Sequence, residues 1–305
     1  LRQIVPLLIA LSLLVLAIWA INRELKAYRL QDVVDSFTLI SPKRKLEALG
    51  LTALGYLSMA GYDWLGVLYS GSSVPLVRII RTAFVSHVLG NTIGFTIFSG
   101  TAIRYRYYAA GGLSGVTIAK IITFTHLAFW LGIFTIGGMV FILDPLKIPT
   151  NLKIPLTDVR TWGFVFLGIV LVYFLLITRQ RQPIRWRGEE FPIPSINVSL
   201  GLIIFSFIDW ALAAAVLYVL LPEKFPLGFP RFFGIYVLAL TAGVISTVPG
   251  GLGVFETVIL FLRPESVPAP AILGSLLAYR WVYFFLPLVV ALVLILGYEW
   301  QHRAK

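Results

Sequence analysis

The chain has 305 residues, of which 58% are hydrophobic and 13% are charged, and its mean hydropathy is +0.89. No soluble core of this length could hide so much apolar surface, so the composition excludes a soluble domain and predicts a polytopic helical membrane protein. The absence of cysteine excludes disulfides, thiol catalysis and cysteine-ligated metals. The net charge of +11 fits anionic lipid headgroups and excludes nucleic acid as a partner, because the basic residues only punctuate apolar segments.

Apolar segments long enough to span a bilayer, which takes about 20 residues, recur along the whole chain. Eight are expected, at about 4–21, 48–70, 79–103, 121–143, 161–178, 198–221, 232–262 and 271–297. The first lacks a small-residue cleavage site and is expected to be a true span, not a signal peptide. The loops are short, so residues 1–305 are expected to form a single membrane domain.

Two of these segments contain residues that interrupt a helix. The third carries several glycines beside Asn91, and the seventh carries a Pro-Gly-Gly-Leu-Gly run. Irregular backbone at membrane depth is tolerated only inside protein or beside a wet cavity, so either segment could be re-entrant. The residues expected to form a structural hinge are Pro249, Gly250, Gly251 and Gly253.

The basic loops bear on orientation. Loops 22–47 and 179–197 are both rich in Lys and Arg, and both would prefer the cytoplasm. Four predicted spans separate them, so we expect them on one side of the membrane. The basic C-terminus joins that side only if the seventh segment is re-entrant.

A sequence pattern that occurs once in each half of the chain favours a transporter-like organisation. Tyr62-Asp63-Trp64 lies inside the second span and Ile208-Asp209-Trp210 inside the sixth, each followed by a proline loop and a glycine-interrupted segment. Diverged repeats with broken helices at matching places are typical of secondary transporters. The expected halves are about 45–143 and 198–297, with chance similarity as the alternative.

Charged residues within the apolar segments are expected to face the protein interior. Each costs about 2.5–3.5 kcal/mol at the centre of a membrane helix. In one interpretation Arg104 binds a lipid phosphate, while Asp63, Asp209 or Glu256 binds a cationic headgroup. In the other, Arg104 forms an internal ion pair with Glu256 or an aspartate.

Weaker polar candidates accompany them. His87 and Asn91 lie one turn apart on a helix, and with His126 they could relay protons or simply bond neighbouring carbonyls. Arg280 lies among aromatic residues, where it could reach the membrane interface or a phosphate. The candidate lipid-binding residues are Arg104, Glu256, Asp63, Asp209, Arg280 and Asn91.

Several kinds of chemistry have no motif here. The glycines of the seventh segment lack the Lys-Ser/Thr of a nucleotide-binding loop, and no Gly-x-Ser-x-Gly elbow is present. The three histidines are far apart in the sequence. We therefore expect no metal, no cofactor and no catalytic residue.

Two stretches, together with Tyr62-Asp63, carry a family resemblance. Ser246-Thr-Val-Pro249-Gly-Gly251-Leu-Gly253-Val-Phe-Glu256 and Gly94-Phe-x-x-Phe-Ser-Gly100-x-x-x-Arg104 resemble the lysylphosphatidylglycerol synthase transmembrane (flippase-like) family. The chain looks like the N-terminal membrane domain of the bacterial multiple peptide resistance factor or a stand-alone relative. The resemblance covers the second span to the eighth.

The resemblance implies a flippase of the bacterial cytoplasmic membrane. It would move aminoacylated phosphatidylglycerol between leaflets and so confer resistance to cationic antimicrobial peptides. The family's soluble aminoacyl-transferase domain is not in this sequence, so we expect a transporter and not an enzyme. A lipid synthase domain or subunit and a second copy of the chain are possible partners. The alternatives are a membrane enzyme or subunit acting on another lipid or a polyprenyl carrier, and a scaffold for a separate synthase.

Overall fold

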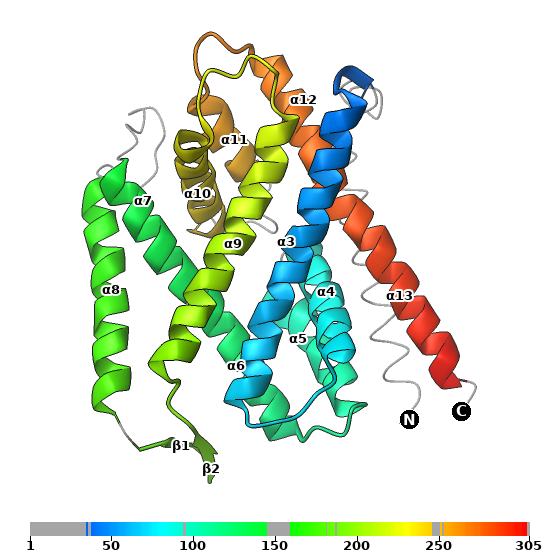
Figure 1. The fold of residues 1–305 in the computed structure, drawn as a ribbon, viewed down its shortest axis with the longest axis vertical. Helices are drawn as coiled ribbons and strands as arrows, with labels where there is room; N and C mark the ends of the chain where they lie inside the picture. The colour runs from blue at the N-terminus through cyan, green and yellow to red at the C-terminus, as the bar shows by residue number, and fades with distance from the viewer. Residues whose placement is uncertain are drawn as a thin grey trace.

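A computed structural model provides the structure of the chain (Figure 1). It describes residues 35, 38–93, 96–144, 159–180, 182–186, 188–245, 251 and 253–303. The first predicted span, at 4–21, and two of the predicted hinge residues, Pro249 and Gly250, lie outside these residues.

The described chain is almost entirely helical, and the order of elements is similar in its two halves. The first half consists of α3 (Pro42–Tyr69), α4 (Leu76–Ile93), α5 (Thr96–Ala109), α6 (Gly115–Gly132), the π-helical turn η1 (Ile133–Gly137) and α7 (Gly138–Leu143). The second consists of α9 (Ile196–Leu220), α10 (Phe229–Ile245), α11 (Val254–Phe261), α12 (Ala269–Arg280), the π-helical turn η3 (Trp281–Phe285) and α13 (Leu286–Arg303). Each half thus runs from a long helix through two shorter ones to a long helix that contains a π turn.

One helix and one hairpin connect the halves. α8 (Val159–Arg179) leads to the antiparallel strands β1 (Ile184–Trp186) and β2 (Glu189–Phe191). Ile184 pairs with Phe191 and Trp186 with Glu189, and Gly188 makes the turn with a φ of 82°. The following helix, α9, starts where the Ser195 hydroxyl accepts a hydrogen bond from the Val198 amide.

The two opening helices, α3 and α9, pack against each other in antiparallel directions at the centre of the molecule (Figure 1). A glycine allows this close approach, because a Cβ atom at Gly61 of α3 would overlap the Phe205 ring of α9. The central position of α3 explains how it keeps Asp63 fully buried.

The shorter helices form two hairpins at opposite ends of the molecule (Figure 1). α4 and α5 pack together at the lower end, and α10 and α11 pack together at the upper end. α4 also contacts η3 and α13, while α10 contacts η1 and α7. Each hairpin therefore packs against the π turn of the other half, so neither half is complete by itself.

One helix of each hairpin, α5 in the first and α11 in the second, is too short to cross a membrane by itself. α11 has 8 residues, which at 1.5 Å per residue span about 12 Å of a hydrocarbon core about 30 Å thick. The break that precedes it divides the seventh predicted segment into two helices. The third predicted segment is likewise divided, between α4 and α5.

Within the described residues, four helices are long and apolar enough to cross a membrane. They are Gly115–Leu143, Val159–Arg179, Ile196–Leu220 and Ala269–Tyr298. The structure therefore supports a helical membrane domain, whereas eight spans stay a prediction.

One expectation about sidedness is wrong. Residues 38–41 and the first turns of α3 lie at the upper end of the molecule, and the β1–β2 hairpin lies at the lower end (Figure 1). The described parts of the two basic loops lie at opposite ends of the molecule, because the α4–α5 hairpin returns to the end from which it starts. Between these two parts of the chain, α3, the α6–α7 helix and α8 each run from one end of the molecule to the other. The C-terminal end of α13 shares the lower end with the β hairpin.

Candidate functional site

The first cluster of buried charges ties the α4–α5 hairpin to the central helix α3. The Arg104 guanidinium of α5 donates from Nε to Oδ1 of Asp63 at 2.9 Å and from Nη2 to Oδ2 at 2.8 Å. This two-pronged contact is the strongest geometry available to an arginine and a carboxylate. Gly100, one turn before Arg104, leaves room for the guanidinium, since a Cβ atom there would lie 3.2 Å from Nη1.

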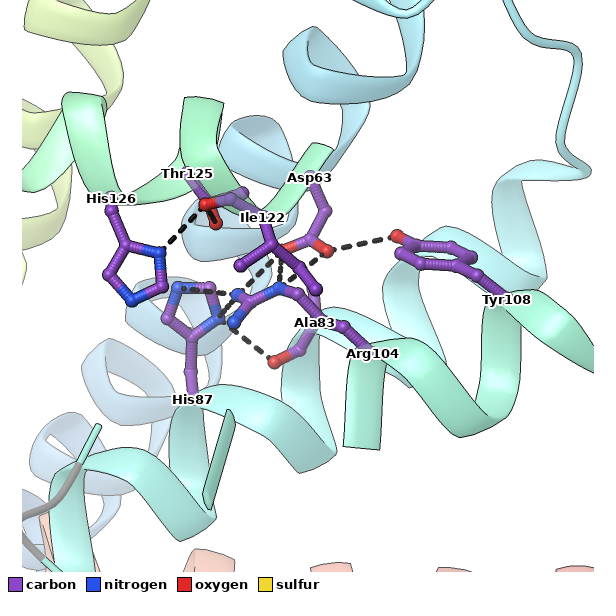
Figure 2. A network of polar contacts seen from close by, with 8 residues as sticks. All are labelled: Asp63, Ala83, His87, Arg104, Tyr108, Ile122, Thr125 and His126. Atoms are coloured by element: carbon purple, nitrogen blue, oxygen red, sulfur yellow. Dashed lines mark hydrogen bonds and ion pairs between the residues drawn. The ribbon is translucent and has the colours of Figure 1, made fainter. Parts of the chain in front are cut away.

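Further polar groups complete this cluster (Figure 2). The Tyr108 hydroxyl donates to Oδ1 of Asp63 at 2.9 Å. The Nδ1 atom of His87 lies 3.0 Å from the Ala83 carbonyl, to which it donates, so Nε2 is left to accept from Nη2 of Arg104 at 3.3 Å. The Asp63 carboxylate thus faces a cation and a hydroxyl donor, and Arg104 is paired inside the protein.

The second cluster ties the α10–α11 hairpin to α12. The Arg280 guanidinium donates to Oε1 of Glu256 from Nε at 2.9 Å and from Nη2 at 2.5 Å. The amide of Gly253 donates to Oε2 at 2.9 Å, so Glu256 also caps the first turn of α11. Arg280 in turn lies over the Phe284 ring, 4.7 Å from its centroid.

In each cluster a hairpin is joined to a long helix by a buried arginine–carboxylate pair, but the charges and the helices differ. In the first half the hairpin supplies the arginine, Arg104, and the opening helix α3 supplies the carboxylate. In the second half the hairpin supplies the carboxylate, Glu256, and the closing helix supplies the arginine from α12. Each pair is nearly inaccessible to water, so one of the two interpretations from the sequence, an internal ion pair for Arg104, is what this conformation contains.

Asp209 lies apart from both pairs, near the middle of α9. Its side chain is buried, with a relative exposure of 6%. Oδ2 accepts a hydrogen bond from the Tyr62 hydroxyl at 3.1 Å, and Oδ1 has no hydrogen-bond partner among the described residues. It is a buried carboxylate whose only hydrogen-bond donor in the described part of the chain is a tyrosine.

Tyrosines fill the space between the two halves near Asp209. The Tyr56 hydroxyl donates to the Tyr283 carbonyl at 3.0 Å, and the Tyr236 and Tyr279 hydroxyls lie 2.9 Å apart. Asn91 of α4 lies beside Tyr56. Sequence reasoning missed this tyrosine group, because its members come from α3, α10, α12 and η3, and only the spacing of Tyr279 and Tyr283 on one helix face was visible.

The remaining predicted residues are placed as follows. Gly251 and Gly253 have φ angles of 64° and 78°, which favour glycine, and a Cβ atom at Gly251 would lie 3.3 Å from the Cα of Gly243. The Nδ1 atom of His126 lies 2.7 Å from the Ile122 carbonyl of its own helix. Within the described residues, no three His, Asp or Glu side chains gather in a way that could hold a metal ion.

Comparison with known proteins places this arrangement in a family. No family model matches the chain. It is 43% identical over 305 residues to the uncharacterized protein slr0712 of Synechocystis sp., which covers all of this chain and 95% of that protein. It is 26% identical over 304 residues to the phosphatidylglycerol lysyltransferase of Staphylococcus haemolyticus, covering 96% of this chain but only 34% of that protein.

A further relative is a membrane protein of similar length. The chain is 30% identical over 261 residues to the inner membrane protein YbhN of Escherichia coli, covering 85% of this chain and 81% of that protein. The apolar helices and buried charge pairs described above are those of a membrane domain. The chain therefore belongs to the flippase-like family of membrane proteins that includes YbhN and the matching part of the phosphatidylglycerol lysyltransferases.

Proposed function

We propose that this chain is a lipid translocase of the bacterial cytoplasmic membrane. It would move an aminoacylated phosphatidylglycerol, such as lysyl-phosphatidylglycerol, from one leaflet to the other and thereby lower the sensitivity of the cell to cationic antimicrobial peptides. The similarity to phosphatidylglycerol lysyltransferases over 34% of their length supports a lipid of this kind. The proposal makes the chain a transporter and leaves lysyl transfer to a separate synthase domain or subunit.

The observation that carries the proposal is the pair of hairpins at opposite ends, each fixed by a buried arginine–carboxylate contact. Broken helices in corresponding places of two halves are typical of transporters whose binding site lies between the halves. The same contacts supply both signs of charge at membrane depth. A lipid headgroup that has a phosphate and an ammonium group needs both.

The headgroup could cross the membrane by replacing the protein partners within the buried ion pairs. Removing one partner of a buried ion pair costs about 3–5 kcal/mol, because the other charge is left without compensation. A headgroup that brings a phosphate to Arg104 and an ammonium group to Asp63 compensates both charges at once. The same exchange is possible at Arg280 and Glu256, with Asn91 as an additional polar contact and the glycines near 251–253 as the hinge.

This mechanism also accounts for selectivity. A purely anionic lipid would satisfy the arginine and leave the carboxylate unpaired, so it would open the contact at a higher cost. The ion pairs would then act as gates that open for a headgroup with charges of both signs and stay closed otherwise, which also prevents leakage of ions.

Reconstituted vesicles test the proposal. The purified chain is placed in liposomes that contain fluorescent lysyl-phosphatidylglycerol or fluorescent phosphatidylglycerol in both leaflets, and a membrane-impermeant quencher is added outside. We expect signal loss beyond the outer-leaflet fraction for lysyl-phosphatidylglycerol, faster than in protein-free vesicles. Arg104→Ala should lower that rate by tenfold or more, which corresponds to at least about 1.4 kcal/mol.

A matched control separates this role from general charge effects. Arg185 also pairs with a carboxylate, at 2.9 Å from Glu190, but its side chain is 79% exposed on the β hairpin. Arg185→Ala should leave the rate unchanged. A plateau at the outer-leaflet fraction for both lipids, with correctly folded protein, would reject translocation and favour a scaffold or a membrane enzyme.

A further inference from the structure

The two intramembrane aspartates occupy similar places in the two halves but have different surroundings. Asp63 on α3 meets the Arg104 guanidinium at 2.8 Å and the Tyr108 hydroxyl at 2.9 Å. Asp209 on α9 meets only the Tyr62 hydroxyl, and its Oδ1 atom has no partner among the described residues. The second half has an arginine of its own, but that arginine is bound to Glu256.

The helices around Asp209 place tyrosines close to it, whereas the buried arginines Arg104 and Arg280 bind other carboxylates. Tyr56, Tyr236 and Tyr283 lie near enough to Asp209 to interact with its charge. Four further titratable groups on the helices that pack against α9 have partners in the structure: His126 with Ile122, Tyr173 with Ser199, Tyr279 with Tyr236, and Arg280 with Glu256.

The chemistry of this site selects its ligand. A hard cation such as Ca²⁺ or Mg²⁺ is held by several oxygen ligands, and within the described residues Asp209 is not part of a group of acidic side chains that could hold a metal ion. A proton needs one oxygen, and Oδ1 is available. An isolated carboxylate removed from water costs many kcal/mol, whereas the neutral acid does not.

We propose that Asp209 is a reversible proton-binding site that couples lipid translocation to the proton gradient. This rests on the proposed lipid translocation. The carboxylate would take up a proton from water when the space between the halves opens to one side, and return it to water when that space opens to the other. The acid would be neutral when the site is closed without lipid, with the Tyr62 hydroxyl donating to Oδ2 and the proton on Oδ1. It would be ionised when the site is closed around the lipid, so that one proton moves for each lipid that crosses.

Infrared spectroscopy of the purified protein tests proton binding without any transport. The wild type should show the carbonyl-stretch band of a protonated carboxylic acid at neutral pH. Asp209→Asn should lose this band, whereas Glu223→Gln, which changes an exposed carboxylate in the loop after α9, should keep it. A wild type without the band, or a band that persists in Asp209→Asn, would overturn the assignment.

Vesicles with an imposed pH gradient and no membrane potential test the coupling. With one proton per lipid, each pH unit should shift the steady-state leaflet ratio about tenfold. This shift should disappear in Asp209→Asn and return in Asp209→Glu. A wild-type leaflet ratio that ignores the gradient would overturn the coupling. If the wild type moves no lipid at all, the lipid proposal fails and the infrared band still decides whether Asp209 binds a proton.

One outcome would assign Asp209 to a different ligand. If the wild type lacks the protonated-acid band and Asp209→Asn stops lipid exchange at equal pH on both sides, then Asp209 binds the cationic group of the lipid and no proton.

Discussion

At the scale of single residues, the buried ion pairs show how a charge can be kept inside a membrane protein at moderate cost. Arg104 and Asp63 satisfy each other with parallel hydrogen bonds, and Tyr108 supplies one more donor. The cost of desolvation is offset only while both partners are present. Removing one residue of such a pair should therefore lower the free energy of unfolding by more than removing an exposed charged residue would.

A double-mutant cycle measures this dependence. Arg104→Ala should lower the free energy of unfolding in detergent by about 3–5 kcal/mol, because Asp63 is left charged and buried. Replacing both residues by alanine should cost less than the sum of the single changes. In the exposed pair of Arg185 and Glu190, Arg185→Ala should cost no more than about 1 kcal/mol. Additive effects at residues 63 and 104 would contradict the direct contact.

The sequence could locate these residues but could not choose their partners. Their position in apolar segments was sufficient to predict that Asp63, Arg104 and Glu256 face the interior, and an internal ion pair was one of two interpretations. Which carboxylate meets Arg104 depends on how α5 packs on α3, 41 residues away in the chain. The periodicity of the sequence within each helix does not predict that packing. It likewise does not predict which tyrosines lie around Asp209.

At the scale of elements, glycines decide how closely the central helices approach. Gly61→Leu should destabilise the protein by about 1–3 kcal/mol, because the added side chain must displace the Phe205 ring of α9. Gly50→Leu on the same helix is the matched control, since no atom lies within 4 Å of its Cβ position. Thermal unfolding in detergent compares the two. Equal melting temperatures would mean that α3 and α9 do not pack as described.

The broken segments were visible in the sequence, whereas their consequence for sidedness was not. Glycines and Asn91 in the third segment predicted a weak helix, and the structure divides that segment into α4 and α5. Counting apolar runs treats such a segment as one crossing, which is why loops 22–47 and 179–197 were expected on the same side. The direction in which a hairpin returns is set by the helices around it, here η3 and α13.

At the scale of the whole molecule, the hairpins predict a definite pattern of accessibility. The chain has no cysteine, so single introduced thiols can be labelled without background. In membranes of known orientation, an impermeant maleimide should label Val77→Cys and Glu190→Cys from one side. It should label Lys43→Cys and Lys224→Cys from the other, because α3 and α10 begin at the upper end in Figure 1. Labelling of Val77→Cys and Lys224→Cys from the same side would contradict the arrangement.

The shortness of α11 has a consequence for how the protein is made. A helix of 8 residues next to a break cannot leave the translocation machinery for lipid by itself, because its exposed backbone groups would find no partners there. Its carboxylate, Glu256, finds its arginine only when α12 has been synthesised. The α10–α11 segment must therefore wait, held at the membrane or by the insertion machinery, until the helix that completes it arrives. The order of synthesis along the chain thereby becomes an order of assembly, in which the second hairpin is among the last parts to take its place.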